Sequence, residues 1–240
     1  PCVFEFIYFA RPDSIVGGLS VYECRKAFGR QLANECSAKA DIVIPVPDSG
    51  VPAAIGFAEA SGIPFELGII RNHYVGRTFI EPQQSIRALS VKLKHNANKS
   101  LVNGKKVILI DDSIVRGTTS IKIVQMMRDA GATEVHMMIA SPPIIYPDYY
   151  GIDTPVKEQL LAANNSLEEI CSFIGADSVV FLSVDGLYKA MGHPKGRNDL
   201  VPAYTDHCFT GDYPTKLTDK MSKDGIRQLS LLSELNKEIE

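Results

Sequence analysis

Two adjacent carboxylates, Asp111 and Asp112, follow the apolar run at residues 107–110 and precede a loop of small residues. An uninterrupted apolar run of this length is typical of a strand that is buried on both faces of a parallel sheet. Ligands of open α/β sheets bind at the carboxyl ends of such strands. Neighbouring carboxylates repel each other unless hydroxyl groups or a divalent cation bind them. The pair therefore predicts a ligand that carries hydroxyls, a cation, or both.

The loop after the acidic pair has the composition of a phosphate-binding turn. Gly117 permits a close approach of the backbone or a positive φ, and hydroxyls and N–H groups at the start of a helix favour an anion. Apolar residues at helical spacing then predict a helix from Thr118 to a stop at Gly131. An Asp-rich turn before a capped helix is the alternative, but the combination favours a sugar phosphate. The residues of this loop that are expected to bind the sugar phosphate are Ser113, Val115, Arg116, Gly117, Thr118, Thr119 and Ser120.

Patterns typical of strands and helices alternate along the rest of the chain, which predicts an α/β fold with a mostly parallel sheet. Helix 20–37 is expected to carry Arg25, Lys26 and Arg30 on its polar side. The apolar stretch 2–10 is expected to form a strand, and the charged segment 216–240 a peripheral amphipathic helix. The other expected helices are 51–60 and 166–174, and the expected strands are 41–46, 65–70, 106–110, 134–140 and 178–182.

Residues 107–120 resemble the phosphoribosyl pyrophosphate loop of the type I phosphoribosyltransferases. The resemblance implies that the acidic pair holds the ribose hydroxyls and that the loop surrounds the 5-phosphate. It also implies an α/β type I phosphoribosyltransferase fold over residues 1–240, with a small hood and a C-terminal extension. Five further motifs resemble the glutamine amidotransferase branch of this family: FIYFARPDS (6–14), IPVPDSGVPAA (44–54), RNHYVGRTFIEP (71–82), YGID (150–153) and IGADSVVFLS (174–183).

The resemblance also assigns roles to two more segments. Asp48, Ser49 and Gly50 correspond to the pyrophosphate loop, which often contains a cis peptide in this family; taken alone, these residues would be an ordinary turn. Residues 71–87 correspond to a flexible loop that closes over the substrate. The resemblance implies substrate contacts by Arg71 and Tyr74, catalytic roles for Arg77, Asp111 and Asp112, and a Mg²⁺ site at Ser49, Asp111 and Asp112. Lys92 belongs to a cluster of basic residues that is ordinarily a solvated face, and contact with the pyrophosphate is the alternative for it.

The activity implied by the resemblance is an amidotransfer, in which ammonia and phosphoribosyl pyrophosphate give 5-phosphoribosylamine, the first step of purine biosynthesis. AMP and GMP are the expected feedback inhibitors, and a homotetramer is the expected assembly. The chain begins where a second domain would begin, so the N-terminal glutaminase domain is expected to be absent and free ammonia to be the nitrogen source. Two alternatives remain: a salvage-type phosphoribosyltransferase with a nucleobase in its hood, and a noncatalytic regulator that senses phosphoribosyl pyrophosphate.

Composition agrees with one large globular domain. The 240 residues are 45% hydrophobic, and their mean hydropathy is +0.01. No apolar run in the sequence is long enough to cross a bilayer. A net charge of −3 disfavours nonspecific nucleic-acid binding, so neither a membrane nor a nucleic acid is an expected partner.

Five cysteines, an odd number with no CxxC pair, favour free thiols in a reducing cytoplasm. Some members of the resembling branch carry an iron–sulfur cluster bound by four cysteines. Cys2 matches the first of these places, while Asp148, Pro202 and Thr205 stand in the other three, so no cluster is expected. His207 beside Cys208 is interpreted as structural, because two adjacent ligands make a poor metal site.

Overall fold

A four-stranded parallel sheet forms the centre of the protein. The computed structural model describes residues 1–72, 95–152, 154, 156–215 and 217. The strand order is β3 (Ile42–Pro45), β6 (Lys106–Asp111), β7 (Glu134–Ile139) and β8 (Ser178–Phe181). All of β3 and all but the first residue of β6 are buried, as the apolar runs predict. In the register, Pro45 lies opposite Ile110 and Asp111 lies opposite Ile139, so the carboxyl ends of three strands meet at one edge.

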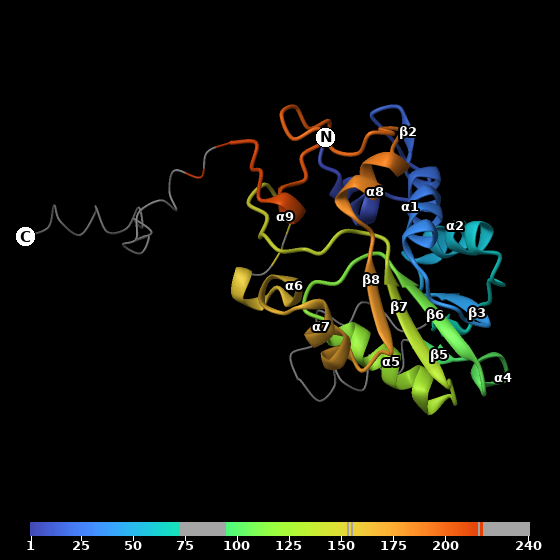
Figure 1. Cartoon of the computed structure of the whole chain (residues 1–240). Helices are drawn as coiled ribbons and strands as arrows, with labels where there is room; N and C mark the ends of the chain where they lie inside the picture. The colour runs from blue at the N-terminus through green and yellow to red at the C-terminus, as the bar shows by residue number, and fades with distance from the viewer. Residues whose placement is uncertain (73–94, 153, 155, 216, 218–240) are drawn as a thin grey trace, which may run out of the picture.

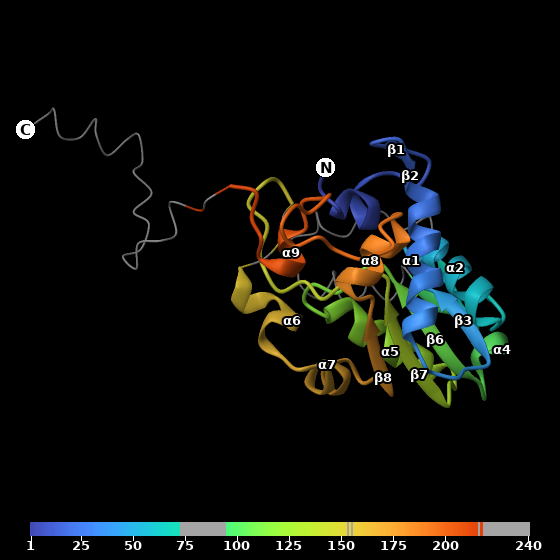
Figure 2. The same cartoon turned by 45° about the horizontal axis from the view of Figure 1, so that its top comes forward.

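Helices cover both faces of this sheet (Figures 1 and 2). α1 (Val21–Glu35) and α2 (Val51–Ser61) pack with the side chains of Val43 and Ile108 in one apolar cluster. α5 (Thr118–Asp129) and α7 (Leu167–Ile174) pack with Ile44 and Leu109 in a second cluster. Because side chains alternate along a strand, the two clusters lie on opposite faces, and the result is a three-layer αβα arrangement.

Smaller elements connect these layers. β1 (Ile15–Val16) and β2 (Leu19–Ser20) form one antiparallel pair, and β4 (Ile69–Arg71) and β5 (His95–Ala97) form another. The remaining described elements are η1 (Glu5–Phe9), α4 (Lys99–Val102), η3 (Lys157–Gln159), α6 (Leu161–Asn164), α8 (Val184–Ala190) and α9 (His207–Thr210).

A small unit beyond one end of the sheet corresponds to the expected hood. η1, α8 and α9 lie together there, above the strands in the view of Figure 1. The ring of Phe4 stacks on that of Phe209 with centroids 5.8 Å apart, and the amide of Val3 donates to the carbonyl of Thr205 over 3.0 Å. Within the described part of the chain, no helix combines the length and the apolar character that a bilayer crossing requires.

The expected strand at residues 2–10 is wrong, because Glu5–Phe9 forms a single π-helical turn. Aromatic and branched residues favour strands, which explains the expectation. In the structure Phe6 and Ile7 are buried while Glu5 and Tyr8 are exposed, a pattern that suits a helical turn better than an alternating strand. Among the described residues, the strand-like pairing of this segment is a single bridge from Cys2 to Thr205, and a side chain of α1 binds the carbonyls of Phe6 and Ala10.

Two further expectations are corrected. The strand expected at 65–70 begins only at Ile69 and pairs with β5 outside the main sheet, while Phe65 makes an isolated bridge to Val43. Arg25, expected on the polar side of its helix, is 4% exposed. The helix expected at 216–240 lies outside the described residues.

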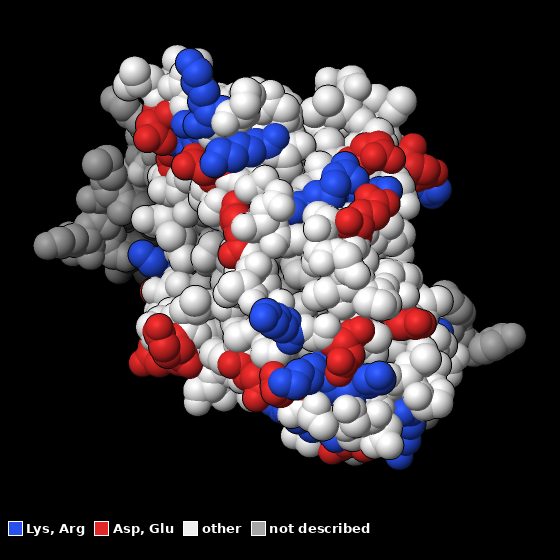
Figure 3. All heavy atoms as spheres, turned by 45° about the vertical axis from the view of Figure 1, so that its right-hand side comes forward, with Lys and Arg blue, Asp and Glu red and all other residues white. Residues whose placement is uncertain are grey.

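On the face that includes α1 and α2, acidic and basic side chains are interspersed (Figure 3), and Glu59 pairs there with both Lys26 and Arg30.

Candidate active site

The acidic pair lies at the carboxyl end of β6. Asp111 is the last residue of the strand, and Asp111 and Asp112 are 8% and 7% exposed. The amide of Asp112 donates to Asp111 Oδ1 over 2.9 Å, and the hydroxyl of Ser113 donates to Asp112 Oδ1 over 2.6 Å. These bonds fix both carboxylates at the strand end, as the sequence predicts.

Burial raises the pKa of both carboxyl groups. The pKa of Asp111 is well above its ordinary value, because burial disfavours the charged form and the Asp112 carboxylate adds like-charge repulsion. Burial also raises the pKa of Asp112, although hydrogen bonds from Ser113 and Ser49 and the charge of Arg25 partly oppose this. Two carboxylates held close together at a cost are a common sign of a ligand site.

The loop after the pair leads into α5 and leaves the start of that helix open. Gly117 precedes the first residue of α5 with φ +74°, and no side chain caps this helix terminus. The first-turn N–H groups and the hydroxyls of Thr118 and Thr119, both exposed, therefore remain suited to an anion. Ser120 is buried at 3% exposure, so its hydroxyl is less accessible than the other two.

Contacts with the segment around α6 hold the outer side of this loop. The carbonyl of Val115 accepts a hydrogen bond from the amide of Leu161 over 2.8 Å. The guanidinium of Arg116 donates to Gln159 Oε1 over 3.2 and 3.1 Å. A Cβ at Gly117 would lie 2.7 Å from a Leu161 methyl, so glycine allows the closest approach of the loop to α6 without a shift of that side chain.

The expected pyrophosphate loop follows β3 and lies beside the acidic pair. The Pro47–Asp48 peptide is cis, as the resemblance implies. The amide of Val46 donates to the carbonyl of Ile110 over 2.8 Å, and a Cβ at Gly50 would lie 2.3 Å from that same oxygen. This close contact places the loop against the end of β6.

Two of the expected ligands in this loop have partners within the site. The Ser49 side chain hydrogen-bonds the Asp112 carboxylate, and Asp48 forms an ion pair with Arg71. The structure thus brings together the three expected metal ligands, Ser49, Asp111 and Asp112. Tyr74, Arg77 and Lys92 lie outside the described residues.

Arg25, expected on the polar side of its helix, is instead buried and its charge acts on Asp112. Its guanidinium donates from Nε to the carbonyl of Phe6 and from Nη2 to that of Ala10, both over 2.8 Å. Burial lowers its pKa, and the neighbouring charge of Asp112 opposes that shift. The sequence feature that could have predicted this burial is the position of Arg25 directly after Cys24, because helical spacing allows two adjacent residues to lie on the inward face.

A four-stranded parallel sheet with helices on both faces and paired carboxylates at the end of β6 has the arrangement expected of a type I phosphoribosyltransferase fold. The sequence profile described as the phosphoribosyl transferase domain matches residues 19–141. The chain therefore belongs to the phosphoribosyl transferase domain family.

Individual relatives refine this assignment. The chain is 60% identical to the amidophosphoribosyltransferase of Rhizobium etli over 97% of its own length and 47% of the relative's. It is 55% identical to amidophosphoribosyltransferase 1, chloroplastic, of Arabidopsis thaliana over 93% of its length and 38% of that protein. A solved glutamine phosphoribosylpyrophosphate amidotransferase from B. subtilis, complexed with ADP and GMP, matches with a TM-score of 0.81 and 52% identity over 94% of this chain and 48% of that one. The chain thus spans less than half the length of these relatives.

Proposed function

We propose that this domain transfers the phosphoribosyl group of phosphoribosyl pyrophosphate to ammonia and forms 5-phosphoribosylamine, the first step of purine biosynthesis. The observation that carries the proposal is the buried carboxylate pair between two anion-binding loops, in a chain at least 55% identical to two named amidophosphoribosyltransferases. Nucleobase transfer and noncatalytic sensing are not favoured by any feature of the described site.

The ribose and its 5-phosphate suit the two halves of the β6–α5 segment. Asp111 and Asp112 offer acceptor oxygens for the 2- and 3-hydroxyls, and hydroxyl donors would offset the loss of solvation that raises both pKa values. The 5-phosphate would bind at the uncapped start of α5, where N–H groups, Thr118 and Thr119 are available. One short segment would therefore orient the whole sugar.

The pyrophosphate would lie against the loop after β3. In this loop Asp48 is exposed and Ser49 is half-buried, and Arg71 is held beside the loop by its ion pair with Asp48. The described donors also fit magnesium, because two carboxylates and a hydroxyl are the hard oxygen ligands that this ion prefers. We therefore infer that Ser49, Asp111 and Asp112 hold Mg²⁺, which would supply positive charge to the departing pyrophosphate.

The reaction would proceed by substitution at C1 of the ribose. The bond from C1 to the pyrophosphate oxygen breaks, and the pyrophosphate leaves with the electron pair. The nitrogen of ammonia forms the new bond from the opposite face and then loses a proton to solvent. Because no protein nucleophile is needed, the described residues act by positioning the sugar and by stabilising charge.

Regulation and assembly extend this proposal. The B. subtilis relative was solved with ADP and GMP, which supports nucleotide binding by the present domain. We infer inhibition by AMP and GMP at a site that overlaps the sugar phosphate loops, and a homotetrameric assembly. Pyrophosphate release measured with increasing GMP tests the first inference, and light scattering tests the second.

The catalytic proposal is tested by pyrophosphate release from phosphoribosyl pyrophosphate and Mg²⁺, with ammonium, adenine or hypoxanthine as the acceptor. We expect release with ammonium only, and an Asp111→Asn variant should lose at least about 99% of it, since a substrate-orienting interaction is worth several kcal/mol in the transition state. Asp129→Asn, an exposed position at the far end of α5, is the matched control and should retain full activity. Release that depends on a nucleobase, or substrate binding with no release in any arm, would contradict the proposal.

A further inference from the structure

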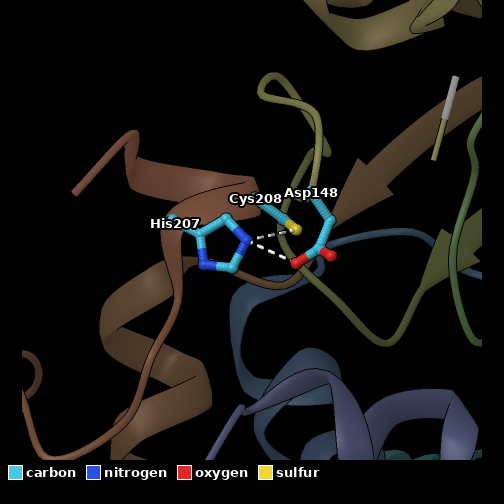
Figure 4. A group of neighbouring side chains, drawn as sticks. All are labelled: Asp148, His207 and Cys208. Carbon is cyan, nitrogen blue, oxygen red and sulfur yellow. Dashed lines mark hydrogen bonds and ion pairs between the residues drawn. The ribbon is translucent and has the colours of Figure 1, made fainter. Parts of the chain in front are cut away.

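Three buried side chains meet at a place distinct from the carboxylate pair. Asp148, His207 and Cys208 are 7%, 1% and 2% exposed. One possible ligand atom from each lies within 4.8 Å of the other two. Figure 4 shows that His207 Nε2 faces both the Asp148 carboxylate and the Cys208 sulfur. Aspartate, histidine and cysteine are three of the side chains that bind zinc most often.

Backbone hydrogen bonds fix this arrangement. Asp148 Oδ1 accepts from the amide of Tyr150 over 2.7 Å and from that of Ile152 over 2.8 Å, which leaves Oδ2 directed at His207. The carbonyl of Cys208 accepts from the amides of residues 145 and 146 over 3.0 and 3.1 Å. The segment that carries Asp148 is therefore tied to α9, which carries the other two groups. Supporting bonds of this kind orient the ligands of protein metal sites.

The buried carboxylate of this cluster is paired with a histidine, which is positively charged only when it is protonated. Among the described residues, the ion-pair partner of Asp148 is His207, with Nε2 2.6 Å from Oδ2. The other ring nitrogen, Nδ1, is buried and has no hydrogen-bond partner in the described part of the chain, where the polar interactions of the imidazole involve Nε2. A buried carboxylate is stable only when it is paired or bound to a metal.

We propose that Asp148 Oδ2, His207 Nε2 and Cys208 Sγ bind a single divalent cation of intermediate softness, represented by Zn²⁺. Tetrahedral zinc with bonds of about 2.3 Å to sulfur and about 2.0 Å to nitrogen separates those ligand atoms by about 3.5 Å. The sulfur of Cys208 lies 3.6 Å from His207 Nε2. His207 Nε2 and Asp148 Oδ2 would have to move about 0.8 Å farther apart to reach the spacing of two ligands on tetrahedral zinc. On binding, the Cys208 thiol releases its proton to solvent, and the proton that His207 Nε2 directs at Asp148 leaves that nitrogen, so that the neutral imidazole then carries its proton on Nδ1.

A cavity beside the cluster provides room for a fourth ligand. It has a volume of about 330 Å³, and its lining includes Cys2, Asp148, Thr205 and His207. A water molecule or the thiolate of Cys2 would complete the coordination from this side. The proposed ion differs from an iron–sulfur cluster, because it needs one metal, no inorganic sulfide and a histidine ligand.

Metal binding by the intact 240-residue chain tests the proposal directly. After treatment with a chelator, the chain is titrated with Zn²⁺ and Co²⁺. The amount of metal bound per chain is then measured by elemental mass spectrometry. We expect one equivalent of either metal per chain, and a Co²⁺ spectrum with tetrahedral d–d bands and a thiolate charge-transfer band. Cys208→Ser should abolish that band and weaken Zn²⁺ binding about 100-fold or more, and Asp148→Asn should weaken binding by at least about tenfold.

Cys171→Ser is the matched control, since Cys171 is a half-buried thiol on α7 away from the cluster and should not affect binding. Circular dichroism of each variant separates loss of a ligand from loss of the fold. Three results would overturn the proposal: no stoichiometric metal in the wild-type chain, a Co²⁺ spectrum that Cys208→Ser leaves unchanged, or iron bound together with acid-labile sulfide. None of these measurements depends on phosphoribosyl transfer, so this proposal and the catalytic one can fail separately.

Discussion

Replacing Asp111 by asparagine should stabilise the protein while removing its activity. When both carboxyl groups of the buried pair are ionised, their mutual repulsion at an effective dielectric constant of about 20 is on the order of 3 kcal/mol. The asparagine oxygen still accepts the hydrogen bond from the amide of Asp112, but the loss of its charge costs about 1 kcal/mol. The free energy of unfolding should therefore rise by about 2 kcal/mol, equivalent to about 4–8 °C in melting temperature for a domain of this size.

The effect should depend on pH with a definite sign. Because the folded-state pKa of each carboxyl lies above its unfolded value of 3.8, the native state binds protons more tightly than the unfolded chain. The wild-type pair contributes no charge repulsion below the unfolded pKa, and its penalty grows as the pH rises through the folded pKa values. The stability gained by Asp111→Asn should thus be close to zero near pH 3.5 and should increase as the pH rises through the folded pKa values of the pair.

Urea unfolding of both chains between pH 3.5 and 8 checks this prediction, with Asp129→Asn as the exposed control. Binding of phosphoribosyl pyrophosphate with Mg²⁺ should raise the melting temperature of the wild-type chain and not that of the variant. Equal stability of the two chains at neutral pH, or a gain that does not change with pH, would refute the assigned repulsion between the two carboxylates.

Three further substitutions have defined outcomes. Gly50→Ala places a Cβ 2.3 Å from a backbone oxygen of β6, so it should cost about 3 kcal/mol in urea unfolding and weaken substrate binding measured by calorimetry; unchanged binding would contradict the loop assignment. Arg25→Met leaves the buried carbonyl of Phe6 and the half-buried carbonyl of Ala10 without this donor and should cost about 3 kcal/mol, whereas Lys26→Met in the same helix should leave the urea midpoint close to that of the wild-type chain. Arg25→Met should also raise the pKa of Asp112 further, because the neighbouring positive charge is lost, and NMR titration measures this shift. Gly117→Ala forces alanine to φ +74° and should cost about 1–2 kcal/mol from the backbone alone, measured as a lower melting temperature.

The strands of the main sheet and the helices that cover it were predictable from the sequence because local periodicity determines them. β6 and α5 follow the predicted pattern, and the register of β3 against β6 then brings the loop around Ser49 to the acidic pair, as the resemblance implies. The N-terminal segment was not predictable in this way. Its residues favour a strand, but a helical turn buries Phe6 and Ile7, and Arg25 binds its carbonyls.

By itself, the sequence determined the α/β class, the acidic pair and its loop, because these depend on neighbours in the chain. Only the tertiary structure decided the burial of Arg25 beside Asp112 and the meeting of Asp148 with His207 and Cys208. Asp148 lies 59 residues before His207, so no local pattern connects them. Such contacts arise from the packing of the hood on the sheet, and burial then changes the charge balance and the metal-binding capacity of side chains that look ordinary in the sequence.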